Sequence, residues 1–266
     1  MNKNETPMLE RFWETIGGTL IEEYQIVSKT STCERRCIDA VILPNGERGR
    51  AKWHEVSLAG QDIVIVQAKA SQLGFCLMGQ AVFSSMLVER LKPKSLESVA
   101  LCGADDSNLS PLLEPFRKIR IVIDPLATKG SRPGTSPEKE FGVALVQNRV
   151  REYWWKLGKG TLIFNYPLVG RHVAHAIIFL QGNFREADYS ERLSLTGEEI
   201  IVVTTRDNAG TRPGMCSMGR AYFSAEIARL HKPASLQSVI ASKATDSALE
   251  PFLNVPPFQY VKVVTV

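Results

Sequence analysis

The chain has 266 residues, of which 44% are apolar and 23% charged, and its formal net charge is +4 at pH 7. This composition excludes a largely disordered chain, because it supplies enough apolar side chains for packed cores. No stretch approaches the roughly 20 apolar residues that span a bilayer, and the opening residues MNKNETPMLERFW lack an apolar signal region. We therefore expect a cytoplasmic protein without membrane association, and the mild basic charge permits nucleic-acid binding without requiring it.

The first predicted element is an amphipathic helix that ends at Gly17-Gly18. Its apolar stripe has helical spacing and consists of Leu9, Phe12, Trp13 and Ile16. Three apolar strands are predicted next, near residues 19–28, 37–43 and 62–68. A second helix is predicted over roughly residues 74–91, and Lys92-Pro93 ends it.

A strand containing SVALCG, a short helix in NLSPLLEPF and a final strand in KIRIVID complete this first half of the chain. The order α-β-β-β-α-β-(α)-β predicts an α/β domain in which helices flank a mixed central sheet.

The second half of the chain repeats the first. Residues 74–99 align without gaps on residues 214–239, and 13 of these 26 positions are identical. Similar matches join ERFWETIGGTLIEEYQIV to EYWWKLGKGTLIFNYPLV, and GQDIVIVQAK to GEEIIVVTTR. The sequence therefore predicts a tandem duplication, packed as a pseudo-dimer. We expect one domain over residues 1–125, a Pro- and Gly-rich linker over 126–140, and a second domain over 141–266.

Two predicted strands of the first copy carry polar interruptions. Asp39 lies inside the apolar run RRCIDAVILP, and Lys69 follows shortly after the β-branched run Ile63–Val66. An Asp and a Lys on neighbouring strands could form a structural ion pair at the end of the sheet, which would contribute little to stability.

The first copy resembles the PD-(D/E)xK nuclease superfamily, which has this element order, an Asp on the second strand and an (E/Q)-x-K triplet on the third. Asp39 and Gln67-Ala68-Lys69 occupy those positions, and Gln67 resembles the Q-x-K variant of Mrr-like restriction endonucleases. The resemblance implies two restriction-endonuclease-like domains, of which the first is active. It also implies a catalytic acid on the first helix, for which Glu10 is the candidate and Glu14, one turn later, the runner-up.

The resemblance further implies a hard divalent cation, Mg²⁺ or Mn²⁺, held by the Asp39 carboxylate, the Gln67 amide oxygen and the Ala68 carbonyl. Lys69 would then orient the attacking water and stabilise charge that develops on the phosphate. Gln67 and Lys69 are expected on one face of their strand because side chains alternate with a period of two.

The second copy keeps the apolar frame and replaces these residues. His175 stands at the position of Asp39, and Thr204-Thr205-Arg206 stands at the position of the Q-x-K triplet. This contrast indicates a degenerate second domain, and it favours a functional site in the first copy over a purely structural ion pair.

Further polar side chains of the first copy are candidates for nucleic-acid contact, and they are Gln80, Arg35, Arg36 and Lys52. The sequence thus predicts a metal-dependent nuclease acting on nucleic acid, most simply DNA, with restriction or antiviral defence as a possible setting. The alternative is a catalytically inactive nuclease-fold module for nucleic-acid binding or protein assembly. A homodimer or a partner subunit is compatible with both.

Overall fold

The computed structural model describes residues 4–127, 137–191, 193–205 and 212–266, and of residues 137–143 and 145 it describes the backbone alone. The chain divides into two compact units, Met1–Gly134 (unit 1) and Thr135–Val266 (unit 2). The predicted linker overlaps the first helix of unit 2, which begins at Pro137, and residues 128–136 lie outside the described residues.

Unit 1 follows the predicted order with one added edge strand. Its elements are α1 (Thr6–Ile16), β1 (Thr19–Val27), β2 (Arg36–Leu43), β3 (Gly49–Arg50), η1 (Trp53–Glu55), β4 (Asp62–Gln72), α2 (Phe75–Glu89), β5 (Ser95–Ala104), η2 (Ser110–Leu113) and β6 (Ile119–Ile123). They form a six-stranded sheet in the order β3-β1-β2-β4-β5-β6. Strand β2 is antiparallel to both of its neighbours, whereas β4, β5 and β6 are parallel.

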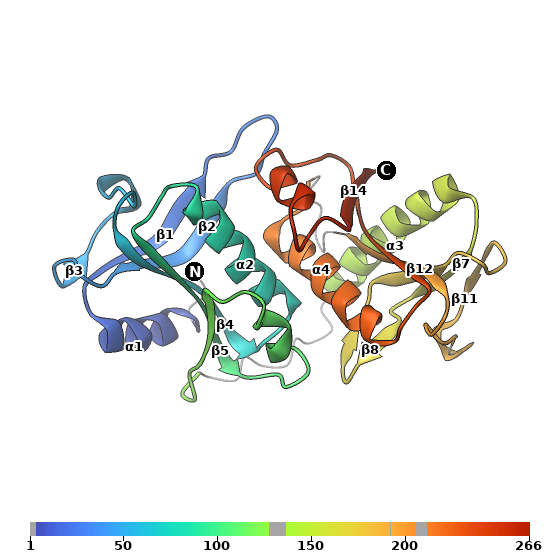
Figure 1. The fold of residues 1–266 in the computed structure, drawn as a ribbon, viewed down its shortest axis with the longest axis horizontal. Helices are drawn as coiled ribbons and strands as arrows, with labels where there is room; N and C mark the ends of the chain where they lie inside the picture. The colour runs from blue at the N-terminus through green and yellow to red at the C-terminus, as the bar shows by residue number, and fades with distance from the viewer. Residues whose placement is uncertain (1–3, 128–136, 192, 206–211) are drawn as a thin grey trace. The chain divides into compact units, whose positions relative to one another are not determined.

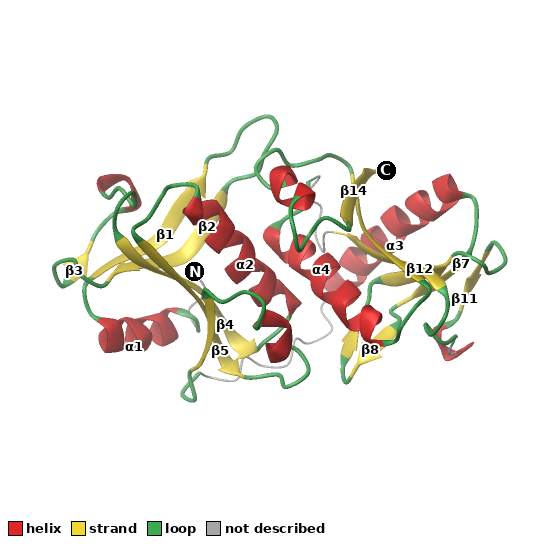
Figure 2. Ribbon diagram, in the orientation of Figure 1, coloured by secondary structure: helices red, strands yellow, loops and turns green. Residues whose placement is uncertain are grey.

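Unit 2 repeats this arrangement. Its elements are α3 (Pro137–Leu157), β7 (Thr161–Phe164), β8 (Pro167–Val169), β9 (His172–Val173), β10 (Ala176–Phe179), β11 (Arg185–Ala187), η3 (Tyr189–Glu191), β12 (Glu199–Thr205), α4 (Met215–Leu230), β13 (Ser235–Ser242), η4 (Glu250–Asn254) and β14 (Val261–Thr265). Its sheet has the order β11-β7-β10-β12-β13-β14, which matches unit 1 strand for strand. The fold class is therefore confirmed as mixed α/β, with two six-stranded mixed sheets flanked by helices (Figure 2).

In unit 1 the helices α1 and α2 cover opposite faces of the sheet (Figure 1). Alternation along β4 explains why, since Val64 and Val66 pack with Met8 and Leu9 of α1, while Ile63 and Ile65 pack on the face that includes Val88 of α2. Both faces of β4 are thus buried, as expected for a central strand that helices cover on both sides.

The turn after the first helix requires glycine in both units. Gly18 and Gly160 have φ of +73° and +87°, and a Cβ on either would lie within 2.6 Å of a backbone carbonyl oxygen. Only glycine combines that backbone conformation with such a close approach. This requirement accounts for one of the most visible identities between the two copies.

Within the described part of the chain, no helix is long and apolar enough to cross a membrane.

Candidate functional site

The candidate site of unit 1 lies where the ladder between β2 and β4 ends. The two strands pair only from Ile42–Val64 to Ala40–Val66. A regular antiparallel ladder would next join Ala68 to Ile38. Instead, the Oδ2 atom of Asp39 accepts the Ala68 backbone N–H at 2.8 Å. The carboxylate therefore occupies a gap between the strands, toward the carboxyl end of β4.

A kink in β2 turns Asp39 into this gap. In a regular strand Ile38 and Ala40 would share a face, but they belong to cores on opposite faces of the sheet. On the neighbouring strand, Glu23 lies between the residues paired with Ile38 and Ala40, and its φ is +48°. The irregularity directs the intervening side chain, Asp39, along the sheet toward β4.

Lys69 and Glu5 bring further charges to this end of β4. The Lys69 Nζ lies 3.2 Å from the Glu5 Oε1, and the Glu5 side chain is only 8% exposed. Glu5 precedes α1 directly, so the start of that helix lies beside the site. Asp39, Lys69 and Glu5 thus come from three separate elements of unit 1.

Electrostatics link the same three groups. Burial raises the pKa of Asp39 above its usual range, and the Glu5 carboxylate acts in the same direction. The Ala68 N–H and the Lys69 amine oppose this rise. Asp39 is therefore a partly desolvated carboxylate held beside one cation and one further acid, a combination that is common at functional sites.

Gln67 does not reach this cluster. It is fully buried, and its Nε2 donates a hydrogen bond to the Ser84 Oγ on α2 at 2.7 Å. Its Oε1 is buried and has no hydrogen-bond partner in the described part of the chain. The side chain is thus anchored beneath α2, and this geometry does not support its expected role as a metal ligand.

Ala68 remains a candidate through its backbone. In a strand the N–H and C=O of one residue leave on the same side. The Ala68 N–H points to Asp39, so its carbonyl oxygen also faces the gap between β2 and β4.

Glu10 lies elsewhere on α1. Its Oε1 accepts a hydrogen bond from Arg50 at 2.6 Å on an exposed surface, where Arg50 also pairs with Glu22. The expectation that Glu10 supplies the helix acid therefore needs correction, because Glu5 is the acid next to Lys69. The first helices match through Trp13 with Trp154 and Gly17 with Gly158, which places Val146 at the position of Glu5, so this acid is absent from the second copy.

The predicted nucleic-acid contacts are scattered. Arg35 and Lys52 are exposed, and Gln80 is half-buried on α2. Arg36 is only 6% exposed, so its burial disfavours the expected phosphate contact.

Unit 2 keeps the backbone of the site with other side chains. The last pair between β10 and β12 is Ala176–Val203, and just beyond it the His175 Nδ1 accepts the Thr205 backbone N–H at 3.4 Å. This contact matches the one between Asp39 and Ala68. Asn165 has φ of +50° at the position of Glu23, so the kink is retained as well. Arg206, the counterpart of Lys69, lies outside the described residues.

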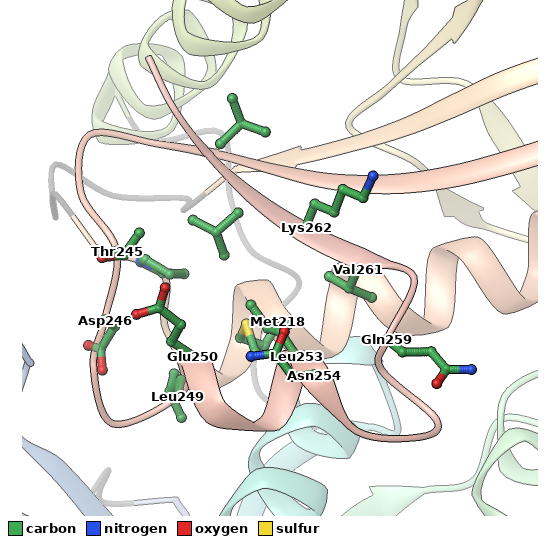
Figure 3. Close-up of a pocket in the computed structure, with 13 residues that line it drawn as sticks. Met218, Thr245, Asp246, Leu249, Glu250, Leu253, Asn254, Gln259, Val261 and Lys262 are labelled. Atoms are coloured by element: carbon green, nitrogen blue, oxygen red, sulfur yellow. The ribbon is translucent and has the colours of Figure 1, made fainter.

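A separate cavity of about 350 Å³ lies in unit 2 among η4, β14 and α4 (Figure 3). Its most buried acid is Asp246, which accepts the Ala248 N–H at 3.1 Å. Asp106 of unit 1 makes the same contact with the Asn108 N–H. Asp246 therefore shapes a turn that both copies share, and we assign the cavity no role in the candidate site.

No protein-family model, no curated protein and no solved structure matches this chain.

Proposed function

We propose that unit 1 is a metal-dependent nuclease that hydrolyses phosphodiester bonds, with DNA as the expected substrate. The observation that carries the proposal is the meeting of Asp39, Lys69 and Glu5 at the end of β4, where the ladder to β2 opens. The strand order and the position of Asp39 on the second strand of the meander support the resemblance to PD-(D/E)xK nucleases. Ligands of α/β sheets commonly bind at the carboxyl ends of parallel strands, which adds support.

The donor set fits a hard cation such as Mg²⁺ or Mn²⁺. Only Oδ2 of Asp39 has a hydrogen-bond donor in the described part of the chain, which leaves Oδ1 available. Asp39, Glu5 and the Ala68 carbonyl would hold the ion, and water would complete its shell, since Mg²⁺ needs few carboxylates. Among the described residues, no three His, Cys, Asp or Glu side chains lie close enough together to hold a metal ion, so this site would depend on water and backbone ligands. When bound, the cation would polarise the phosphate and lower the pKa of a coordinated water.

Lys69 contributes a positive charge beside the carboxylates. Its side chain is 40% exposed, so its amine can donate to a phosphate oxygen or to a water near the scissile bond. Lys69 pairs with Glu5, and its charge also acts on the Asp39 carboxyl. The N–H of Ala68 donates to Asp39 Oδ2 and so fixes the orientation of this carboxylate, as hydrogen bonds to metal-binding carboxylates commonly do.

Cleavage of plasmid, linear and single-stranded DNA in Mg²⁺ or Mn²⁺ tests the proposal. We expect activity that EDTA abolishes, and Asp39→Ala or Lys69→Ala to lower the rate by about 10²–10³-fold. Glu10→Gln and His175→Ala are matched controls that should retain activity, because neither residue contacts the cluster. Cleavage at wild-type rate in both Asp39→Ala and Lys69→Ala would refute the proposed site.

A second candidate is nucleic-acid binding without cleavage. The burial of Gln67 and the neutralisation of Lys69 by Glu5 favour it, because both weaken the expected metal site. If this second function is correct, the affinity for nucleic acid in a gel-shift assay should fall steeply with salt and should be unchanged by Asp39→Ala. Metal-dependent cleavage that Asp39→Ala abolishes would rule it out.

A further inference from the structure

A groove of unit 1 lies between the second half of α2 and the chain that leads into β6. Its volume is about 300 Å³, and its apolar lining consists of Val82, Met86, Pro115, Phe116 and Ile119. Pockets that bind small molecules measure about 300–1,000 Å³, so this groove has room for one large side chain rather than for a bulky cofactor.

Four exposed basic side chains border this groove and a second hollow beside it, and they are Lys92, Lys94, Arg117 and Lys118. The Lys94 Nζ lies 2.8 Å from the Asp62 Oδ2, and the Lys118 Nζ lies 2.7 Å from the Glu89 Oε1. Among the described residues, the other two cations have no ion-pair partner. These four residues, which we call the basic rim, therefore carry more positive charge than the neighbouring acids neutralise.

Unit 2 fills the matching space with its own aromatic rings. Tyr222 and Tyr260 stand where unit 1 has Val82 and Lys118. The two tyrosine rings stack with their centroids 5.7 Å apart, and the Tyr222 ring also meets that of Phe258 at 4.6 Å. The second copy thus shows that the space between this helix and the last strand accommodates phenol rings, which the first copy lacks.

The basic rim also distinguishes unit 1 from unit 2. Only Lys92 has a basic counterpart, Lys232, whereas the other three positions of the rim hold Ala234, Gln259 and Tyr260. The open groove and its positive border therefore occur together in one copy, and both are altered in the other.

We propose that unit 1 binds an acidic peptide segment of a partner protein here, with one aromatic side chain in the groove and flanking carboxylates on the basic rim. The ring would take the place that Tyr222 fills in unit 2, and it would bury apolar surface against Val82 and Met86. Lys92 and Arg117 would pair with Asp or Glu side chains of the peptide, since their charges are not neutralised within unit 1.

The lining of the groove favours a peptide over a nucleic acid. Phe116 supplies the one ring among the described residues that line it, whereas single-stranded nucleic acid is usually held by several rings on which successive bases stack.

The groove and the candidate site lie at opposite ends of the sheet. The basic rim reaches Asp62 and Ser95, where β4 and β5 begin, whereas Asp39 meets β4 at Ala68 near its other end. Peptide binding is therefore independent of the proposed nuclease activity.

Fluorescence anisotropy of a labelled peptide, in which one tyrosine lies between runs of Asp and Glu, tests the proposal on the full chain. We expect saturable binding that replacement of the peptide's tyrosine by alanine weakens about tenfold or more. Val82→Tyr installs the unit 2 residue in the groove and should weaken binding to a similar extent. Met86→Glu also installs the unit 2 residue, and it keeps the test decisive if Val82→Tyr does not fold. It should weaken binding because it removes apolar contact and repels the acidic peptide.

The contribution of the basic rim is measured with Arg117→Gln, again the unit 2 residue, which should weaken binding and reduce its dependence on salt. Lys29→Gln removes an exposed cation between β1 and β2, and Asp39→Asn changes the candidate site, so both should leave peptide binding unchanged.

Absence of saturable binding, or binding that Val82→Tyr and Met86→Glu both leave unchanged, would overturn the proposal. Peptide binding that does not depend on the tyrosine, and that single-stranded DNA displaces, would assign the basic rim to nucleic acid and would also overturn it.

Discussion

Unit 1 and unit 2 place left-handed residues at matching points of the repeat, Glu23 with Asn165 and Lys92 with Lys232. These conformations are uncommon for residues other than glycine, so their retention shows that the backbone is under the same constraint in both copies. The two lysines lie in the turns that follow α2 and α4, whereas Glu23 and Asn165 lie at the kinks beside the candidate site and its counterpart. The duplicated units therefore share their backbone irregularities, including one that serves the site.

The surface ion pairs differ between the two units, unlike the backbone irregularities. In unit 1, Arg50 of the edge strand pairs with Glu10 of the first helix. In unit 2, Glu186 of the edge strand pairs with Arg151 of the first helix. The interaction is kept while the signs are exchanged, which a structural contact allows. The candidate site shows no such exchange, because Asp39 and Glu5 are replaced by His175 and Val146, and both carboxylates are lost.

The largest expected effect is a loss of stability in the matching cores of the two units. Phe83 and Phe223 occupy matching positions of α2 and α4, and both are fully buried. We expect Phe83→Ala and Phe223→Ala each to lower the free energy of unfolding of their own unit by about 3–5 kcal/mol. Hydrogen exchange resolved by segment would measure both losses. A large loss in one unit and almost none in the other would contradict the equivalence of the two cores.

An exchange of the site residue sharpens the comparison. Asp39→His installs the unit 2 residue in unit 1, and the imidazole can still accept the Ala68 N–H as His175 accepts that of Thr205. If unit 1 is the proposed nuclease, the fold should persist while cleavage falls by about 10²–10³-fold, because the oxygen ligand is lost. Melting temperature and initial cleavage rate would be measured together.

The reciprocal exchange, His175→Asp, should create no cleavage in unit 2, because Val146 replaces Glu5 there. Cleavage by Asp39→His at the wild-type rate would show that the carboxylate has no role in the reaction.

The pH dependence of the free energy of unfolding should show how much the burial of the charged Asp39 carboxylate destabilises the fold. Burial raises the pKa of this carboxyl in the folded chain, so the folded state binds the proton more tightly than the unfolded state does. Stability should therefore fall as the pH rises from the unfolded pKa, about 4, through the folded pKa. Asp39→Asn keeps a hydrogen-bond acceptor for Ala68 and carries no charge, so it should gain stability over the wild type across this range.

Urea unfolding of the wild type and of Asp39→Asn between pH 4 and pH 8 would measure that gain. His175→Ala is the control, because it changes the matching residue of unit 2 and leaves the carboxyl of Asp39 in place. A stability difference between wild type and Asp39→Asn that is independent of pH would mean that the carboxyl is not desolvated.

Much of the fold could be predicted because the repeat doubled the information. The predicted strands near 19–28 and 37–43 correspond to β1 (Thr19–Val27) and β2 (Arg36–Leu43), and the predicted helix over 74–91 corresponds to α2 (Phe75–Glu89). The two-residue strand β3 was not predicted, because Gly49–Arg50 pairs by backbone contacts that leave no apolar pattern. Its partner is the start of β1, which lies 30 residues earlier in the chain (Thr19↔Gly49).

The candidate site could be predicted only in part. The alternation of side chains along a strand correctly places Ala68 and Gln67 on opposite faces of the sheet. It cannot show that the Gln67 amide donates to Ser84, or that the longer Lys69 side chain reaches Glu5. Both endpoints depend on how α1 and α2 sit on the sheet. The resemblance points to an acid within the first helix, Glu10, whereas the acid beside Lys69 is Glu5, which precedes the first turn.

The smallest expected effect comes from the exchanged surface pair. A double variant of unit 1, Arg50→Glu with Glu10→Arg, adopts the polarity of Arg151 and Glu186 in unit 2. Its free energy of unfolding should lie within about 1 kcal/mol of the wild type, because exposed ion pairs contribute little. Glu22 also pairs with Arg50, so the single variant Arg50→Glu should lose more than the double variant does. Urea unfolding of both variants measures this difference, and a double variant less stable than Arg50→Glu alone would contradict an interchangeable pair. Cleavage should be unaffected in both, because the pair lies away from the three charged groups at the end of β4.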